Sequence, residues 1–150
     1  MTDSKRAASD YNGEKDPRRK GDIFEKLVVT SLAKRYKGTI VTERNLGSAT
    51  VFDGLTTHNG RPVVIEVKHR ISIVSLSDGN TGTQLPRQVE MALSNEGVYE
   101  LIIAPHTTIG PILRSQLTDL ERSASLRWRI SEFDPATGSF RLRCSSKADS

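Results

Sequence analysis

Two carboxylates and a lysine on neighbouring predicted strands have residue types and spacing that suit joint chemistry. β-Branched residues precede and follow Asn59-Gly60, which is the pattern of a two-residue β-hairpin turn. The register that this turn imposes sets Asp53 directly opposite Glu66, in a pair whose side chains approach closely. Strand alternation puts Lys68 on the same face of the hairpin. The sequence therefore predicts a carboxylate pair with an ammonium group beside it.

Two carboxylates that face each other repel, so the pair is unfavourable unless a cation lies between them. Mg²⁺ is typically bound by one or two carboxylates together with waters and phosphate oxygens of a substrate. A lysine beside the pair can stabilise the charge that builds on a phosphoryl group under attack. A solvated strand face whose charges Lys68 balances explains the same three residues. From these residues alone, both interpretations remain open.

Hydrophobic periodicity and turn residues predict the elements that position this hairpin. The run VYELIIA is typical of a buried strand, and a helix with apolar residues at helical spacing precedes the hairpin. The expected elements are helices over 23–36, 86–95 and 111–122 and strands over 39–46, 50–57, 62–71, 98–104, 126–133 and 139–144. This order, αβββαβα and then a hairpin, predicts an α/β or α+β fold with helices flanking a mixed central sheet.

Length and composition favour a single domain in a reducing compartment. The chain has 150 residues, 35% of them hydrophobic and 27% charged, with a net charge of +4 that suits a nucleic-acid partner. No apolar run is long enough to span a membrane, and the N-terminus lacks a secretory signal. The single cysteine, Cys144, excludes an internal disulfide, so we expect a cytoplasmic location. Residues 1–19 are expected to form a flexible basic tail, residues 20–144 the folded domain, and residues 145–150 a disordered C-terminus.

These motifs resemble those of the PD-(D/E)XK nuclease superfamily. Its members carry an aspartate, a spacer and a Glu-x-Lys motif on the next strand, which matches Asp53, Glu66 and Lys68. The segment KGDIFE (20–25) is similar to the opening helix of archaeal Holliday-junction resolvases and Mrr-like restriction nucleases. The resemblance extends from this helix to the apolar strand and includes the αβββαβ order of the restriction-endonuclease-like core. Phe52 departs from the pattern, because many members have proline there.

The resemblance implies a role for each matching residue. Asp53 and Glu66 would bind Mg²⁺ or Mn²⁺ together with the carbonyl oxygen of Val67, and Glu25 would reach the metal directly or through water. Lys68 would orient the attacking water and stabilise the phosphorane, because its acidic neighbours favour the ammonium form over a general base. The metal would activate its bound water as the nucleophile. Cleavage in the superfamily leaves a 5′-phosphate and a 3′-hydroxyl.

Further residues could contact the substrate or support the metal site. Some superfamily nucleases place a glutamine near the metal, and Gln88 lies in the corresponding helix, although a polar helix-start residue is the simpler interpretation. Arg70 shares the face of Lys68 and could contact a phosphate. Four arginines alternate with apolar residues in the last hairpin, which predicts one face that is either a phosphate-binding surface or a solvated surface balanced by acids. The expected nucleic-acid contacts are Lys20, Arg127, Arg129, Arg141 and Arg143.

Together the motifs predict a Mg²⁺-dependent endodeoxyribonuclease that hydrolyses DNA phosphodiester bonds as a homodimer. Resolvase-like activity on branched DNA and a minimal restriction-type activity are both compatible with them. Two other functions remain open: a nucleic-acid-binding subunit of a larger complex with little or no catalysis, and an RNA-cleaving toxin or defence nuclease. A binding module has no need for a repulsive carboxylate pair, which favours the enzyme.

Overall fold

A computed structural model describes residues 3–36, 41–42, 54–58, 60–76 and 85–147 of the chain. In chain order the helices and strands are α1 (Asp3–Gly13), α2 (Pro17–Tyr36), β1 (Val41–Thr42), β2 (Gly54–His58), β3 (Arg61–Lys68), β4 (Ser72–Ile73), α4 (Arg87–Ser94), β5 (Val98–Ile103), β6 (Thr108–Ile109), α5 (Pro111–Ala124), β7 (Arg127–Asp134) and β8 (Ser139–Ser145). The predicted order of the helices and long strands is therefore confirmed. The helix α1 and the short strands β4 and β6 were not expected.

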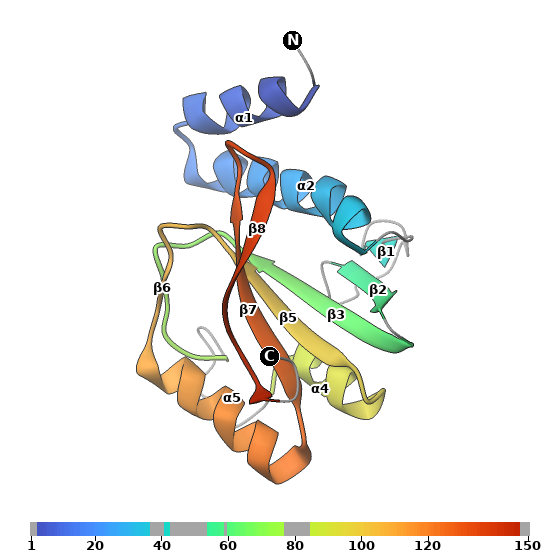
Figure 1. Cartoon of the computed structure of the whole chain (residues 1–150). Helices are drawn as coiled ribbons and strands as arrows, with labels where there is room; N and C mark the ends of the chain where they lie inside the picture. Colours follow the sequence, from blue (N-terminus) through green and yellow to red (C-terminus); the bar gives the residue numbers. More distant parts are fainter. Residues whose placement is uncertain (1–2, 37–40, 43–53, 59, 77–84, 148–150) are drawn as a thin grey trace.

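The centre of the fold is a six-stranded mixed sheet in the order β1-β2-β3-β5-β7-β8 (Figure 1). Strands β3, β5 and β7 are parallel, whereas β2 pairs antiparallel with β3 and β8 pairs antiparallel with β7. A separate parallel pair is formed by β4, which follows β3, and β6, which follows β5. The mixed sheet with flanking helices confirms the predicted α/β class.

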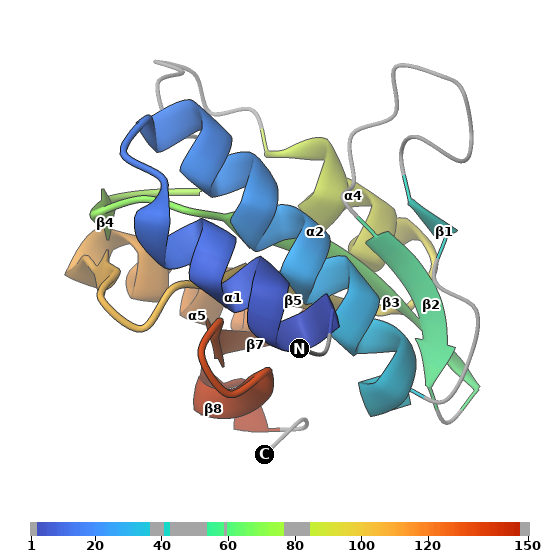
Figure 2. The same cartoon turned by 90° about the horizontal axis from the view of Figure 1, so that it is seen from above.

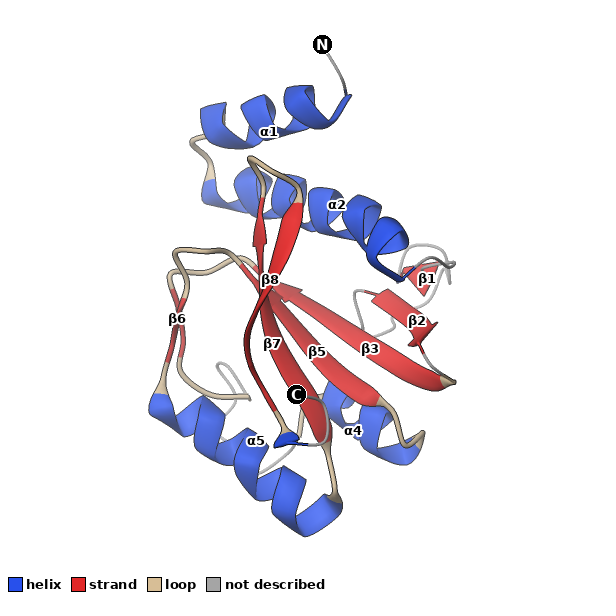
Figure 3. Ribbon diagram, viewed as in Figure 1, coloured by secondary structure: helices blue, strands red, loops and turns tan. Residues whose placement is uncertain are grey.

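Helices cover both faces of the sheet, with α1 and α2 on one side and α4 and α5 on the other (Figure 3). Alternation along β3 divides its side chains between two apolar cores. Val63 and Ile65 pack with Phe24 and Val28 of α2. Val64 packs on the opposite face, in the core that α4 and α5 cover. Consecutive residues of β3 therefore face different helices.

A single buried stripe holds α2 on the sheet. Phe24, Val28, Leu32 and Tyr36 recur every four residues, and all four are buried. The helix ends at Tyr36 as predicted but begins earlier, at Pro17, because the fixed φ of proline suits a first helical turn. Within the described ranges, no helix has the length and apolar character needed to cross a membrane.

The N-terminal segment is helical, which corrects the expectation of a flexible tail over residues 1–19. Helix α1 lies alongside α2 (Figure 2), with Ala8 and Tyr11 buried. The hydroxyl of Tyr11 and Nε2 of His69 form a hydrogen bond of 2.7 Å, and the Tyr11 ring contacts Phe24. These partners are far away in the sequence. The polar composition of the segment indicated disorder. The sequence could not show that its few apolar residues have partners, because those contacts form only in the folded chain.

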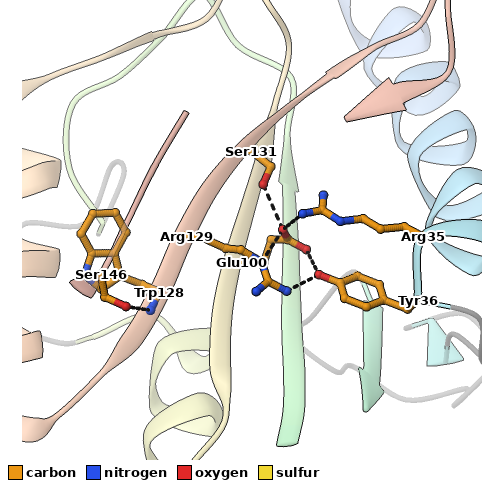
Figure 4. Close-up of polar contacts among 7 residues, drawn as sticks. All are labelled: Arg35, Tyr36, Glu100, Trp128, Arg129, Ser131 and Ser146. Carbon is orange, nitrogen blue, oxygen red and sulfur yellow. Dashed lines mark hydrogen bonds and ion pairs between the residues drawn. The ribbon is translucent and has the colours of Figure 1, made fainter. Parts of the chain in front are cut away.

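The C-terminal hairpin extends further than predicted. The backbone N–H of Ser146 donates to the carbonyl of Trp128 at 2.8 Å, and the Ser146 hydroxyl accepts from the N–H of Trp128 at 3.1 Å (Figure 4). Ser146 is buried. The segment 145–150, which was expected to be disordered, is therefore ordered as far as Lys147.

Candidate active site

The β2–β3 hairpin has the register that its turn predicts. His58 lies opposite Arg61, and the pairing continues to Gly54 opposite Ile65. Asp53, the expected partner of Glu66, lies outside the described residues. The described pairs, from His58–Arg61 to Gly54–Ile65, have the register on which the metal-site interpretation is based.

Glu66 is a buried carboxylate whose two oxygens have different surroundings. The residue is 7% exposed and lies on the α4 and α5 face of the sheet, two positions from Val64. The hydroxyl of Tyr99, on β5, donates to its Oε1 at 2.9 Å. The Nζ of Lys68 lies 3.7 Å from the same oxygen. Among the residues that the structure describes, no hydrogen bond or ion pair reaches Oε2.

This arrangement fits a hard cation such as Mg²⁺. A carboxylate oxygen is the kind of donor that Mg²⁺ prefers, and Oε2 of Glu66 is not among the described buried atoms that lack a partner, so it is open to solvent. Tyr99 and Lys68 both bind Oε1 and so leave Oε2 as the donor for a ligand. The described part of the chain contains no cluster of three or more His, Cys, Asp and Glu side chains that could hold a metal. Of the two carboxylates predicted on the hairpin strands, Glu66 is described, whereas Asp53 is not.

Glu25 lies on the other side of the sheet from Glu66. It follows the buried Phe24 on α2, which covers the face opposite Glu66. The first turns of α2 reach the carboxyl end of β3, where the rings of Phe24 and His69 are 5.0 Å apart. A Cβ at Gly21 would lie 3.8 Å from the Cβ of His69. Glu25 could therefore join Glu66 only around the end of β3, and its role as a metal ligand stays a prediction.

The two auxiliary residues lie on α4 and just beyond the end of β3. Gln88 is half-buried in the first turn of α4, on the side of the sheet that carries Glu66. Arg70 is exposed just beyond β3, and its carbonyl accepts a hydrogen bond of 2.6 Å from the hydroxyl of Thr107. This bond ties the end of β3 to the loop that follows β5. The roles proposed for Gln88 and Arg70 stay predictions.

The arginines of the terminal hairpin lie on two faces, which corrects the expectation of one basic face. Nε of Arg129 donates to Glu100 on the α2 side. The guanidinium groups of Arg141 and Arg143 instead bind the carboxylate of Glu132 on the other side, at 2.6 and 2.5 Å. Each of these three cations is therefore paired with an acid of the same chain.

The register of the hairpin explains this error. Phe133 pairs with Phe140, so the face of β7 that carries Arg129 continues into the face of β8 that carries Phe140. Arg141 consequently falls opposite Glu132. Alternation leaves Arg127 on the Arg129 side, where it is half-buried. The predicted phosphate contacts of these residues remain untested, but three of the four arginines already have buried or nearly buried acidic partners.

Sequence analysis assigned no role to Glu100, whose carboxylate is fully buried on β5. Its Oε1 accepts from the Tyr36 hydroxyl at 2.5 Å, and its Oε2 accepts from Arg129 at 2.7 Å and from Ser131 at 3.0 Å (Figure 4). A guanidinium nitrogen of Arg35 lies 3.2 Å from Oε2. Burial, and then the charge of Glu100, raise the pKa of the Tyr36 hydroxyl. A glutamate within an apolar strand was the only sequence signal for this network.

Comparisons with known proteins give little beyond this geometry. No protein-family model matches the chain. No curated protein matches it either. The chain is similar to the structure of Pyrococcus furiosus SfsA in complex with Ca²⁺, with a TM-score of 0.42 and 14% identity over 87% of this chain. It spans 64% of that protein's length. We therefore base the proposed function on the residues of this chain.

Proposed function

We propose that the chain is a metal-dependent nuclease that hydrolyses DNA phosphodiester bonds. The observation that supports this proposal is the asymmetric setting of Glu66: Oε1 is bound by Tyr99 and Lys68, whereas Oε2 has no partner among the described residues. The carboxylate is 7% exposed, and Oε2 is not among the described buried atoms that lack a partner, so this oxygen can be reached from solvent. An oxygen kept available at the end of a parallel strand suits a ligand.

The residues around Glu66 would have different roles in the hydrolysis of a phosphodiester. Glu66, Asp53 and the carbonyl of Val67 would hold Mg²⁺, which supplies Lewis-acid polarisation of the phosphoryl oxygen and a lowered pKa for a bound water. Tyr99 donates a hydrogen bond to Oε1 of Glu66, and this bond would hold the carboxylate so that Oε2 could bind the metal. Lys68, with its side chain 15% exposed, keeps a positive charge where the phosphoryl group would gain negative charge.

Cleavage by the purified chain tests this proposal. Linear, branched and single-stranded DNA and tRNA are incubated with Mg²⁺, and the products are resolved on a denaturing gel. We expect cleavage of DNA, and a loss of at least about 100-fold in rate for Glu66→Gln, because about 3 kcal/mol of transition-state stabilisation depends on the metal. Glu66→Gln keeps the side-chain volume and changes only the charge and one donor group.

Glu90→Gln is the matched control, because Glu90 is an exposed glutamate of α4. This variant should cleave at the wild-type rate. Equal rates for Glu66→Gln and wild type would refute the metal-ligand role of Glu66. Cleavage of tRNA but not of DNA would move the proposal to an RNA-cleaving enzyme. Sedimentation of the same preparation tests whether the chain forms the homodimer expected from its resemblance to resolvases.

A further inference from the structure

A pocket of about 470 Å³ opens beside the loop that follows β5. Its walls include Thr107, Thr108 and Ile109 from this loop and β6, Arg114 from α5, and Cys144 from β8. The volume lies in the range of sites that bind small groups. Of the residues that line it, the sequence predicted a role only for Arg143, as a nucleic-acid contact.

Hydrogen bonds of Arg143 hold one wall of the pocket in place. Its guanidinium donates to Glu132 at 2.5 Å, to the carbonyl of Thr107 at 2.6 Å and to the carbonyl of Pro105 at 3.2 Å. These bonds occupy the guanidinium and fasten the loop to β7. Arg143 therefore shapes the pocket, and it shares the single negative charge of Glu132 with Arg141.

Arg114 supplies a cation that has no acidic partner among the described residues. Its side chain is exposed on α5, and within the described residues no acid or hydrogen-bond acceptor pairs with it. Burial raises the pKa of the Cys144 thiol, and the charges of Arg114 and Arg143 oppose this rise, so both guanidinium groups lie near the thiol. His106, which is also exposed, lines the same pocket. An unbalanced guanidinium beside a preformed polar wall is suited to an anion.

The pocket lies close to the candidate active site on the same face of the sheet. Lys68, Ile103 and Glu132 form one row across β3, β5 and β7, because Lys68 pairs with Ile103 and Ile103 pairs with Glu132. Adjacent strands are about 4.8 Å apart, so the backbones at Lys68 and Glu132 are separated by about 10 Å. One DNA strand carries a phosphate every 3.4 Å or so of helix rise. Glu132 binds Arg143 of the pocket wall, so a strand that passes around the buried Ile103 could reach both places within a few nucleotides.

We propose that this pocket binds a phosphate group of the nucleic-acid substrate, a few nucleotides from the phosphate that is cleaved. Arg114 is the cation that contacts it, and the loop fastened by Arg143 forms the wall of the site. The inference rests on the proposed nuclease function and adds a second contact on the same strand. It also accounts for substrate binding without the paired arginines of the terminal hairpin.

Cys144 makes the pocket testable, because it is the only cysteine in the chain. The rate of its alkylation by iodoacetamide is measured by mass spectrometry with and without a short DNA duplex, with Ca²⁺ in place of Mg²⁺. We expect the duplex to slow alkylation several-fold in the wild-type chain. Arg114→Gln should remove this protection and reduce the slope of log affinity against log salt by about 0.9, the value for one phosphate contact.

Arg122→Gln is the matched control, since Arg122 lies on the same helix and pairs with Asp119 on an exposed surface. It should keep both the protection and the salt slope. Equal protection in Arg114→Gln and wild type would overturn the inference, as would protection by inorganic phosphate without protection by DNA. Cleavage with Mg²⁺ is assayed in parallel. Cleavage without protection refutes the pocket alone, whereas Arg114-dependent protection without cleavage supports the pocket and refutes the nuclease.

Discussion

Glu66 and Glu100 lie on neighbouring parallel strands, and the protein surrounds them in opposite ways. Glu100 points to the α2 face. Its Oε1 has a partner from α2, and its Oε2 has partners from α2 and from β7. Glu66 points to the α4 and α5 face, where Tyr99 and Lys68 both bind the same oxygen. One glutamate is thus fully matched by its own chain. The other keeps an oxygen without a partner among the described residues.

This difference separates a structural carboxylate from a candidate ligand. A buried charge is costly unless it is paired and hydrogen-bonded, and Glu100 meets this requirement inside the fold. Its partners join the end of α2 to β5 and β7 (Figure 4). Glu66 meets the requirement at Oε1 through Tyr99 and Lys68, whereas Oε2 is open to solvent and to a ligand. Burial alone does not distinguish the two residues, but their partners do.

The largest expected effect is on catalysis, at Lys68. Lys68→Ala should lower the cleavage rate by at least about 100-fold, because a cation near the phosphoryl group is lost. Affinity for the metal should be unchanged or slightly higher, because a positive charge near the carboxylates is removed. Cleavage kinetics and calorimetric titration with Ca²⁺ measure the two effects. Lys26→Ala, on an exposed position of α2, should change neither; a large loss of metal affinity in Lys68→Ala would contradict its role as a stabilising cation.

The next effect is on stability, at the Glu100 network. Arg129→Ala should lower the free energy of unfolding by about 3 kcal/mol, because it removes a partner from a fully buried carboxylate. Arg141→Ala should cost less than about 1 kcal/mol, since its side chain is 77% exposed and its ion pair is in contact with solvent. Urea unfolding measures both values. Similar costs for the two variants would remove the contrast between a buried and an exposed arginine.

A smaller effect is expected at Tyr99. Tyr99→Phe keeps the buried ring and removes the hydrogen bond to Glu66, so metal affinity should fall by about tenfold. Tyr36→Phe removes the corresponding hydroxyl from Glu100 and should leave metal affinity unchanged. Calorimetric titration with Ca²⁺ compares the two variants. Equal affinities would show that Tyr99 does not position Glu66.

The smallest expected effect is the pH dependence of stability that comes from His69, which follows β3 and forms a hydrogen bond with Tyr11 of α1. Burial and then the charges of His106 and Lys20 lower the pKa of His69 below its usual value of 6.5. Between the lowered pKa and 6.5 the unfolded chain binds a proton that the folded chain does not, so stability falls as pH decreases through this window. Melting temperatures should therefore decrease toward acid between about pH 7.5 and pH 5, which covers the ordinary titration range of histidine. His69→Gln should weaken this dependence; an unchanged slope would exclude His69 as its source.

The β2–β3 hairpin could be predicted from the sequence because its signals are local. A turn pair and strand alternation are enough to set His58 opposite Arg61 and to put Glu66 and Lys68 on one face. The order of the long elements follows from periodicity in the same way. Such features depend on residues that are close together in the chain.

Features that depend on distant partners could not be predicted. Tyr11 is buried because His69 and Phe24 meet it in the folded chain. The arginines of the terminal hairpin separate because Phe133 pairs with Phe140, a register that the longer turn did not specify. Glu100 was part of an apolar strand pattern, and its partners come from two other elements. In each case the missing information was a tertiary contact.

Metal binding by Glu66 is the central claim, and Mn²⁺ titration followed by electron paramagnetic resonance tests it most directly. The signal of unbound Mn²⁺ is measured as each protein is added, for the wild-type chain, Glu66→Gln and the control Glu90→Gln. We expect wild type and Glu90→Gln to bind Mn²⁺ equally and Glu66→Gln to bind it at least about tenfold more weakly. Equal binding by all three proteins, or no binding by the wild-type chain, would contradict the assignment of Glu66 as a metal ligand.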